Sequence, residues 1–74
     1  MGALVDKHAG RHSATTGLLR FFEYAHLPDH LKAVSQGSYE LADEMVSRLP
    51  DGPELSTGLR KLLEAKDCFV RAAL

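Results

Sequence analysis

The segment LPDGP, residues 49–53, lies between two long stretches of regularly spaced apolar residues. Proline and glycine in this combination end a helix and form a tight turn. On both sides the repeat falls every three or four residues, which is typical of one face of a helix. The repeating positions are Leu31, Val34, Ser38, Leu41, Met45 and Leu49 before the turn, and Leu55, Leu59, Leu62, Lys66, Phe69 and Ala73 after it. The pattern predicts helices over about 28–49 and from about 54 to the C-terminus, paired as a long antiparallel hairpin.

One polar layer interrupts the predicted seam between these helices. A hairpin folded at this turn places Ser38 opposite Lys66, whereas other positions face apolar partners, such as Leu41 opposite Leu62. Gly37 lies beside the layer and would let a ligand approach the backbone closely. A hydroxyl and an ammonium next to such a gap suit a small anion. The alternative interpretation is that Lys66 extends to solvent while Ser38 bonds a backbone carbonyl.

The first part of the chain predicts a shorter helix, joined to the hairpin by a proline-containing elbow. A serine or threonine within residues 13–16 can cap a helix that runs to about Ala25. The sequence HLPD, residues 26–29, ends it, because a residue before proline is kept out of helical geometry. Residues 1–14 carry two glycines and no sustained periodicity. We therefore predict an all-α protein with a flexible tail over 1–14 and one helical domain over 15–74.

Composition and charge narrow the possible functions. The 74 residues are 45% apolar and 26% charged, which is ordinary for a folded domain. Nine basic and ten acidic side chains give a net charge of −1, which disfavours binding of long DNA or RNA. No apolar run is long enough for a membrane span, and the sequence has no signal-peptide pattern. Cys68 is the single cysteine, so we expect a reducing cytoplasm and no disulfide.

Catalytic and metal-binding patterns are absent from the sequence. Two histidine pairs have four-residue spacing, but neither has an obvious third ligand for a metal ion. They are His8 with His12 and His26 with His30. No phosphate-binding glycine loop and no nucleophile motif occurs. We therefore expect neither an enzyme nor a metal or cofactor.

Three aromatic residues follow one another closely in the predicted first helix. Phe21, Phe22 and Tyr24 cannot all enter one core, because consecutive helical side chains point about 100° apart. At least one is expected to face a ligand or a partner chain. A core this small also predicts a homo-oligomer. One function class that fits is therefore a helical adaptor or oligomerisation module, which would bind a protein partner through these aromatic side chains.

Two stretches of the chain are similar to a known family. They are RFFEYAHLP at residues 20–28, continuing through VSQ at 34–36, and LPDGPE at 49–54 followed by LRKLLEAKD at 59–67. Together they closely resemble the small helical-hairpin family of phage anti-CBASS proteins, the cyclic-nucleotide sponges. The same hairpin occurs in phage anti-Thoeris sponges, for which signals of the cyclic ADP-ribose type are a narrower option. The resemblance covers roughly residues 18–74.

This resemblance implies a function and a location. The protein is expected to be a phage anti-defence protein that sequesters cyclic dinucleotides to block CBASS immunity. Some members of the family also bind cyclic trinucleotides, so the resemblance allows these as further ligands. It is expected to form a homo-oligomer, a hexamer in well-described members, with ligands bound between subunits. It would act in the cytoplasm of the infected bacterial host.

The resemblance also implies site residues. Phe21 stands at an aromatic position that stacks on a base. Gln36 occupies a position where members often carry lysine, and its amide can hydrogen-bond phosphate without supplying a counter-charge. Ser38 matches a hydroxyl position associated with the trinucleotide site, and Lys66 and Arg71 would supply cations. The predicted ligand-binding set is Phe21, Tyr24, Gln36, Gly37, Ser38, Lys66 and Arg71.

Overall fold

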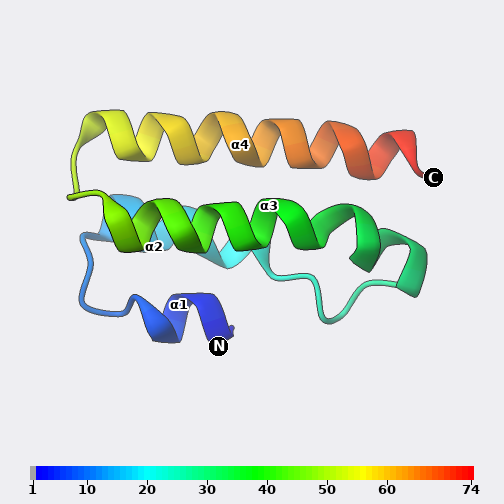
Figure 1. Ribbon diagram of the computed structural model, residues 1–74, viewed down its shortest axis with the longest axis horizontal. Coiled ribbons are helices and arrows are strands. Elements are labelled where there is room, and N and C mark those ends of the chain that lie inside the picture. The colour runs from blue at the N-terminus through cyan, green and yellow to red at the C-terminus, as the bar shows by residue number, and fades with distance from the viewer. Residues whose placement is uncertain (1) are drawn as a thin grey trace.

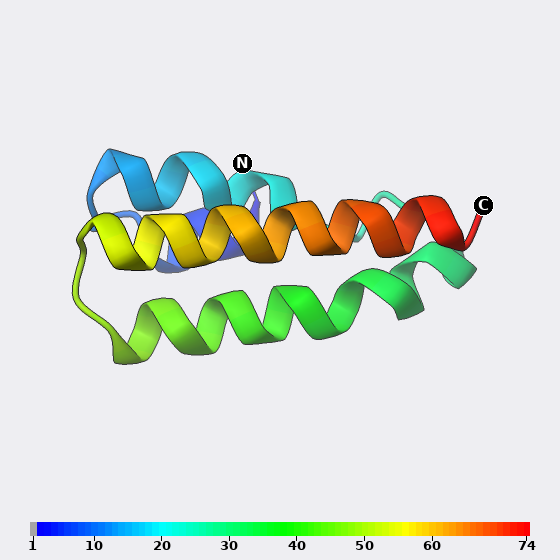
Figure 2. The ribbon, with the colours of Figure 1, turned by 90° about the horizontal axis from the view of Figure 1, so that it is seen from above.

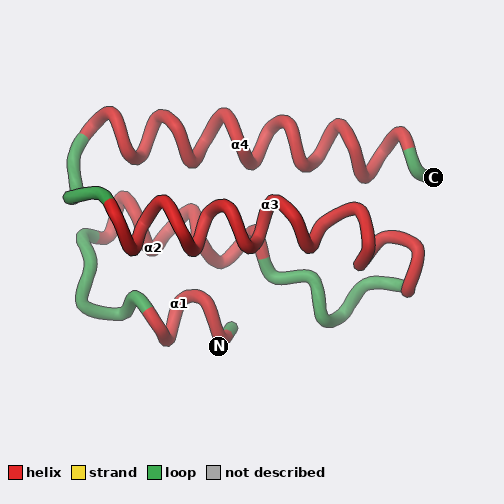
Figure 3. The backbone as a smooth tube through the Cα atoms, in the orientation of Figure 1, coloured by secondary structure: helices red, strands yellow, loops and turns green. Residues whose placement is uncertain are grey.

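The computed structural model describes residues 2–74, and Met1 lies outside the described residues. Within this range its regular elements are all helices (Figure 1). In chain order they are α1 (Ala3–Lys7), α2 (Ser13–Leu19), the 3-10 helix η1 (Arg20–Phe22), α3 (Asp29–Arg48) and α4 (Pro53–Ala72). The loops between them are short, the longest joining η1 to α3 (Figure 3). The prediction of an all-α protein is confirmed.

The two long helices, α3 and α4, lie side by side and run in opposite directions (Figures 1 and 2). α3 begins directly after Pro28 and ends before Leu49 and Pro50, because backbone preceding a proline is driven away from helical geometry. Pro53 opens α4, at the helix position that proline favours. These bounds differ by one residue from the predicted 28, 49 and 54.

The N-terminal residues fold against the long helices, so the prediction of a flexible tail was wrong for the described residues 2–14. Leu4 in α1 is only 1% exposed and belongs to the same core as Leu19, Phe22 and Val46. α2 runs alongside α4 and forms a further layer of the fold (Figure 2). A five-residue helix with one apolar anchor leaves no periodic signal in the sequence, and the tail prediction relied on periodicity.

The helix predicted to reach Ala25 is shorter in the structure. α2 ends at Leu19, and its axis continues for one tighter turn as η1 before Glu23 becomes extended. Its N-terminus is capped by His12, whose Nδ1 accepts a hydrogen bond of 3.0 Å from the Ala14 amide. The expected cap within residues 13–16 was therefore placed slightly too late.

The buried face of α3 is rotated from the predicted one. Leu31 is buried as predicted, whereas the other buried residues, Ser35, Ala42 and Val46, each lie one position after a predicted one. Leu41, which was predicted to lie in the seam, is 43% exposed. The prediction considered only two helices. In the structure, η1 and the segment after α1 also contact α3, and they bury a neighbouring face of it.

Residues that were predicted to form the seam line a shallow apolar groove between α3 and α4. A cavity of about 230 Å³ is lined by residues that the hairpin pairing placed opposite one another. They are Leu41 with Leu62, Met45 with Leu59, and Leu49 with Leu55. Further along α4, Phe69 is 62% exposed, so the prediction that it lies in the seam was wrong.

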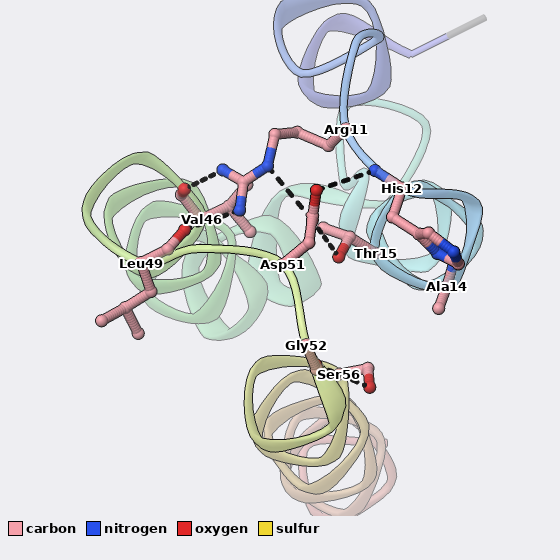
Figure 4. Close-up of polar contacts among 9 residues, drawn as sticks. All are labelled: Arg11, His12, Ala14, Thr15, Val46, Leu49, Asp51, Gly52 and Ser56. Atoms are coloured by element: carbon pink, nitrogen blue, oxygen red, sulfur yellow. Dashed lines mark hydrogen bonds and ion pairs between the residues drawn. The ribbon is translucent and has the colours of Figure 1, made fainter.

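A polar clamp ties the N-terminal segment to the turn between α3 and α4 (Figure 4). The Arg11 guanidinium donates to the carbonyl oxygens of Val46 and Leu49, which lie at the end of α3 and lack helical partners. It also pairs with Asp51 at 3.1 Å. The Asp51 carboxylate in turn accepts from the Thr15 hydroxyl at 2.9 Å. Arg11 thus bonds backbone oxygens at the end of α3 and pairs with the charge of Asp51. Asp51 in turn accepts from a backbone amide of the N-terminal segment.

Hydrogen bonds to Asp51 stabilise its ionised form. The amide of His12, the hydroxyl of Thr15 and the guanidinium of Arg11 together hold the pKa of Asp51 below its ordinary value of 3.8. A second carboxylate, Asp43 on α3, is held in the same way by α1 and the residue after it. His8 Nε2 lies 2.7 Å and Lys7 Nζ lies 2.9 Å from the Asp43 carboxylate, and these bonds also lower its pKa.

Candidate functional site

A cavity of about 390 Å³ lies between η1, the loop that follows it and the C-terminal half of α4. Three of the seven predicted site residues line it, although they come from distant parts of the sequence. The lining residues are Arg20, Phe21, Glu23, His26, Leu27, Lys66, Asp67, Val70 and Arg71. The fold therefore brings Phe21, Lys66 and Arg71 to one cavity.

The aromatic wall of the cavity is Phe21. Its neighbour Phe22 is fully buried, whereas Phe21 is 49% exposed. The two rings diverge because consecutive residues of a 3-10 helix point to different sides. The Arg20 guanidinium lies over the Phe21 ring, with Cζ 4.6 Å from the ring centroid. The expectation that these aromatic side chains cannot all enter one core is confirmed.

Lys66 links the two walls of the cavity. Its Nζ donates to the carbonyl oxygen of Phe21 at 2.9 Å and pairs with the Asp67 carboxylate at 3.0 Å. Its side chain is only 13% exposed, so it does not extend freely to solvent. Lys66 is therefore a largely buried cation that fastens η1 to α4 and places positive charge beside the aromatic ring.

Ser38 does not share a polar layer with Lys66 through hydrogen bonds in the described residues. The Ser38 hydroxyl donates to the carbonyl oxygen of Ser35 at 2.8 Å, as the alternative interpretation of the layer expected. Lys66 instead reaches η1, which the two-helix pairing had not placed against α4. The proposed anion pocket at the helical seam is thus not formed by these two side chains, and the cation belongs to the cavity beside Phe21.

Gln36 and Gly37 lie on the exposed surface of α3, outside the cavity. The Gln36 amide donates to Glu40 at 2.9 Å, a contact between residues one turn apart. A Cβ added at Gly37 would meet no atom within 4 Å, so this glycine faces open space. Together with Ser38, these residues form a polar surface separate from the cavity.

Tyr24 packs against α3 instead of lining the cavity. Its ring meets that of Tyr39 edge to face, with centroids 5.1 Å apart. Burial, together with the negative charges of Glu23 and Asp43, raises the pKa of Tyr39, so the phenol remains protonated at neutral pH. The Tyr24–Tyr39 contact holds the loop between η1 and α3 against the rest of the fold.

The cavity is more basic than the chain as a whole. Arg20, Lys66 and Arg71 face two carboxylates, whereas the whole sequence has a net charge of −1. Both carboxylates already have partners: Glu23 accepts from the Leu4 amide at 2.8 Å, and Asp67 pairs with Lys66. The exposed Arg71 contacts only the Cys68 sulfur, at 3.3 Å, among the described hydrogen bonds. The arrangement suits a flat, anionic ligand.

Sequence reasoning considered His26 only for metal binding or for the turn, and it missed the other lining residues, which are Arg20, Glu23, Leu27, Asp67 and Val70. Four of these six come from η1 and its following loop, which the sequence did not place against α4. Within residues 2–74 the structure forms no cluster of three or more metal-ligating side chains.

The fold and this cavity define a small all-helical protein with a basic cavity that has an exposed aromatic ring in its wall. None of the helices described for residues 2–74 is long and apolar enough to cross a membrane. Comparisons with protein-family models, with curated proteins and with solved structures gave no match. The functional proposal therefore rests on the residues of the cavity and on the sequence motifs that contain them.

Proposed function

We propose that this protein binds and sequesters cyclic oligonucleotide second messengers, and so blocks CBASS immunity in the cytoplasm of a phage-infected bacterium. The observation that carries the proposal is the cavity itself. In it, an exposed aromatic ring lies beside cationic side chains from η1 and from α4. The motifs RFFEYAHLP and LRKLLEAKD, which resemble those of the cyclic-nucleotide sponges, supply Arg20, Phe21 and Lys66 to this cavity.

The chemistry of the cavity matches that of a cyclic dinucleotide, which carries flat bases and anionic phosphates. The exposed face of Phe21 can stack on a base, a contact worth about 1–3 kcal/mol. Lys66 and Arg71 can neutralise phosphate, Arg71 through paired donors and Lys66 as a point charge. No step of bond breaking is required, so the action is binding alone.

A homo-oligomer, a hexamer by resemblance, completes the site in this proposal. A cavity of about 390 Å³ is at the small end for a ligand site and would enclose only part of such a ligand. A second copy would cover the remainder. The exposed apolar groove with Leu41 and Leu49 supports self-association, because large exposed apolar side chains mark contact surfaces.

Cyclic trinucleotides would bind at a second place on the assembly. Gln36, Gly37 and Ser38 form an exposed polar surface on α3, separate from the cavity. The Gln36 amide has a second N–H that can donate to phosphate without contributing charge, and the Ser38 hydroxyl can donate once it leaves the Ser35 carbonyl. Repeated around a symmetric assembly, this surface would present several such donors to one ligand.

Native mass spectrometry with a panel of cyclic di- and trinucleotides tests the proposal. The oligomer is expected to gain a fixed whole number of ligands. The Phe21→Ala variant should lose about 1–3 kcal/mol of binding, roughly 5- to 150-fold in Kd, with an unchanged melting temperature. Phe69→Ala is the matched control, since it removes another exposed phenylalanine outside the cavity. Failure of the unmutated protein to bind any member of the panel would reject the proposal.

The alternative is a helical adaptor that binds a protein partner. The apolar groove of about 230 Å³ between α3 and α4 favours it, in place of the aromatic surface first considered, because Phe22 is buried. Purification from host lysate distinguishes the two functions. A stoichiometric protein partner supports the adaptor, and a co-purifying cyclic nucleotide supports the sponge.

A further inference from the structure

Arg20 is a cation without a polar partner in the cavity. Lys66 is bound to a backbone carbonyl and to Asp67, and Arg71 contacts a sulfur atom. The Arg20 guanidinium, by contrast, makes no hydrogen bond or ion pair within residues 2–74 and rests on the Phe21 ring. Glu23, the nearest carboxylate in sequence, accepts from the Leu4 amide and forms no ion pair with Arg20 within the described residues.

The position of this guanidinium is the position that a stacked base would take. Its Cζ is 4.6 Å from the Phe21 centroid, which leaves no space for a third planar group between them. The contact is with a half-exposed ring, where cation–π attraction is weak, so displacement of the guanidinium requires little free energy. A ligand base can therefore take the ring face, and Arg20 must then move outward.

We propose that Arg20 closes over a base stacked on Phe21, so that the base is held between the phenyl ring and the guanidinium plane. This inference rests on the proposed function and assigns a specific role within it. A guanidinium is planar and stacks on aromatic faces, whereas a lysine ammonium is a compact, strongly hydrated charge. Arg20 would thus act as the second wall of the base site and slow the release of the ligand.

Slow release is the property that separates a stacking wall from a simple positive charge. A charge that only attracts an anion changes the association rate and its dependence on salt. A side chain that covers the bound base instead changes the dissociation rate. The sequestering protein needs the second effect, because a ligand that leaves quickly remains available to its receptor.

Stopped-flow or biosensor kinetics with cyclic di-AMP and cyclic di-GMP test this role in the full-length chain. Arg20→Ala is expected to raise the dissociation rate about tenfold, a change of about 1.4 kcal/mol, with little change in the association rate. Arg20→Lys should dissociate equally fast, because it keeps the charge and loses the plane. Arg60→Ala is the matched control, since it removes one exposed arginine of α4 that does not line the cavity. The Arg20 side chain is exposed, so all three variants should keep the melting temperature.

The outcomes separate this inference from the proposed function. If the unmutated protein binds neither dinucleotide, the assignment of a dinucleotide site and the role of Arg20 both fall. If it binds and Arg20→Lys dissociates as slowly as the unmutated protein, Arg20 acts as a charge and the stacking role is overturned. Tighter binding by Arg20→Ala would overturn it in another way, by showing that the guanidinium only competes with the base.

Discussion

The two ends of the α3–α4 pair are built differently. At the end joined by residues 49–52, α2 packs beside α4, and Arg11 and Asp51 fasten the N-terminal segment to the turn. At the other end Phe69 is 62% exposed, and the cavity beside Phe21 is lined by η1, its following loop and α4. A chain of 74 residues buries only a modest part of its surface. Its core is concentrated toward one end, and the other end leaves large apolar side chains such as Phe69 exposed.

The largest expected effect comes from the shared core, to which η1 contributes Phe22. Phe22 is fully buried in the shared core, so Phe22→Ala should destabilise the fold by about 3–5 kcal/mol. Native proteins have total stabilities of about 5–15 kcal/mol, so this loss is a large fraction of the total. Phe69→Ala at the open end should change stability by only about 0.5 kcal/mol or less. Urea denaturation of both variants measures the contrast, and equal losses would contradict it.

A slightly smaller effect is expected from the N-terminal helix. Leu4 is 1% exposed and its amide donates to Glu23, so Leu4→Ala should cost about 2–5 kcal/mol, toward the lower value in so short a helix. Leu74→Ala, at an 83% exposed leucine near the other end of the chain, serves as the control. Thermal unfolding followed by circular dichroism compares the two. An unchanged midpoint for Leu4→Ala would restore the interpretation of this segment as a tail.

The sequence was sufficient for the parts of the fold that depend on local patterns. The prolines at positions 28, 50 and 53 act on neighbouring backbone, so the bounds of α3 and α4 followed from them closely. The buried face of α3 did not follow, because Ser35 and Ala42 are small and carry no strong apolar signal. Their burial depends on the N-terminal layer, whose anchor Leu4 is a single residue in a non-periodic stretch.

The candidate site was predictable only in part, for a related reason. Phe21 and Lys66 were identified from their chemistry and from the family resemblance, without knowledge that they are neighbours. The contact between Lys66 Nζ and the Phe21 carbonyl oxygen joins residues 45 positions apart through a backbone atom. Backbone carbonyls carry no residue-specific signal, so a contact of this kind cannot be inferred from side-chain types. The contacts of Arg11 could not be predicted for the same reason, because Arg11 also donates to backbone oxygens.

Acid should lower the stability of the contacts that join the N-terminal segment to α3 and to the turn after it. The pKa values of Asp43 and Asp51 are lowered in the folded protein by hydrogen bonds from the N-terminal segment. A lowered folded pKa adds stability that is complete above the unfolded value of about 3.8 and is lost as the pH falls below it. Denaturation at about pH 7, 5 and 3 should therefore show a fall concentrated in the last step.

An asparagine at position 51 tests the source of that acid sensitivity. Asp51→Asn should be less stable than the unmutated protein at neutral pH and should lose less on acidification, because one titrating group of the clamp is gone. Asp29→Asn is the control, since that carboxylate is fully exposed at the start of α3. An acid response that is the same in all three proteins would show that the clamp does not couple to protonation.

The smallest effect concerns a buried hydroxyl on α3. Among the described residues, the Ser35 side-chain oxygen is buried without a hydrogen-bond partner, whereas the polar groups around Arg11 and Asp51 are paired. A buried hydroxyl without a partner is destabilising, so Ser35→Ala should raise stability by about 1 kcal/mol, or roughly 4–8 °C in melting temperature. Ser38→Ala is the matched control, because that hydroxyl is bonded to the Ser35 carbonyl and its loss should be neutral or slightly destabilising. A gain at Ser35 would show that α3 is less optimised for stability than the clamped turn, whereas a loss would show that this hydroxyl has a partner in solution.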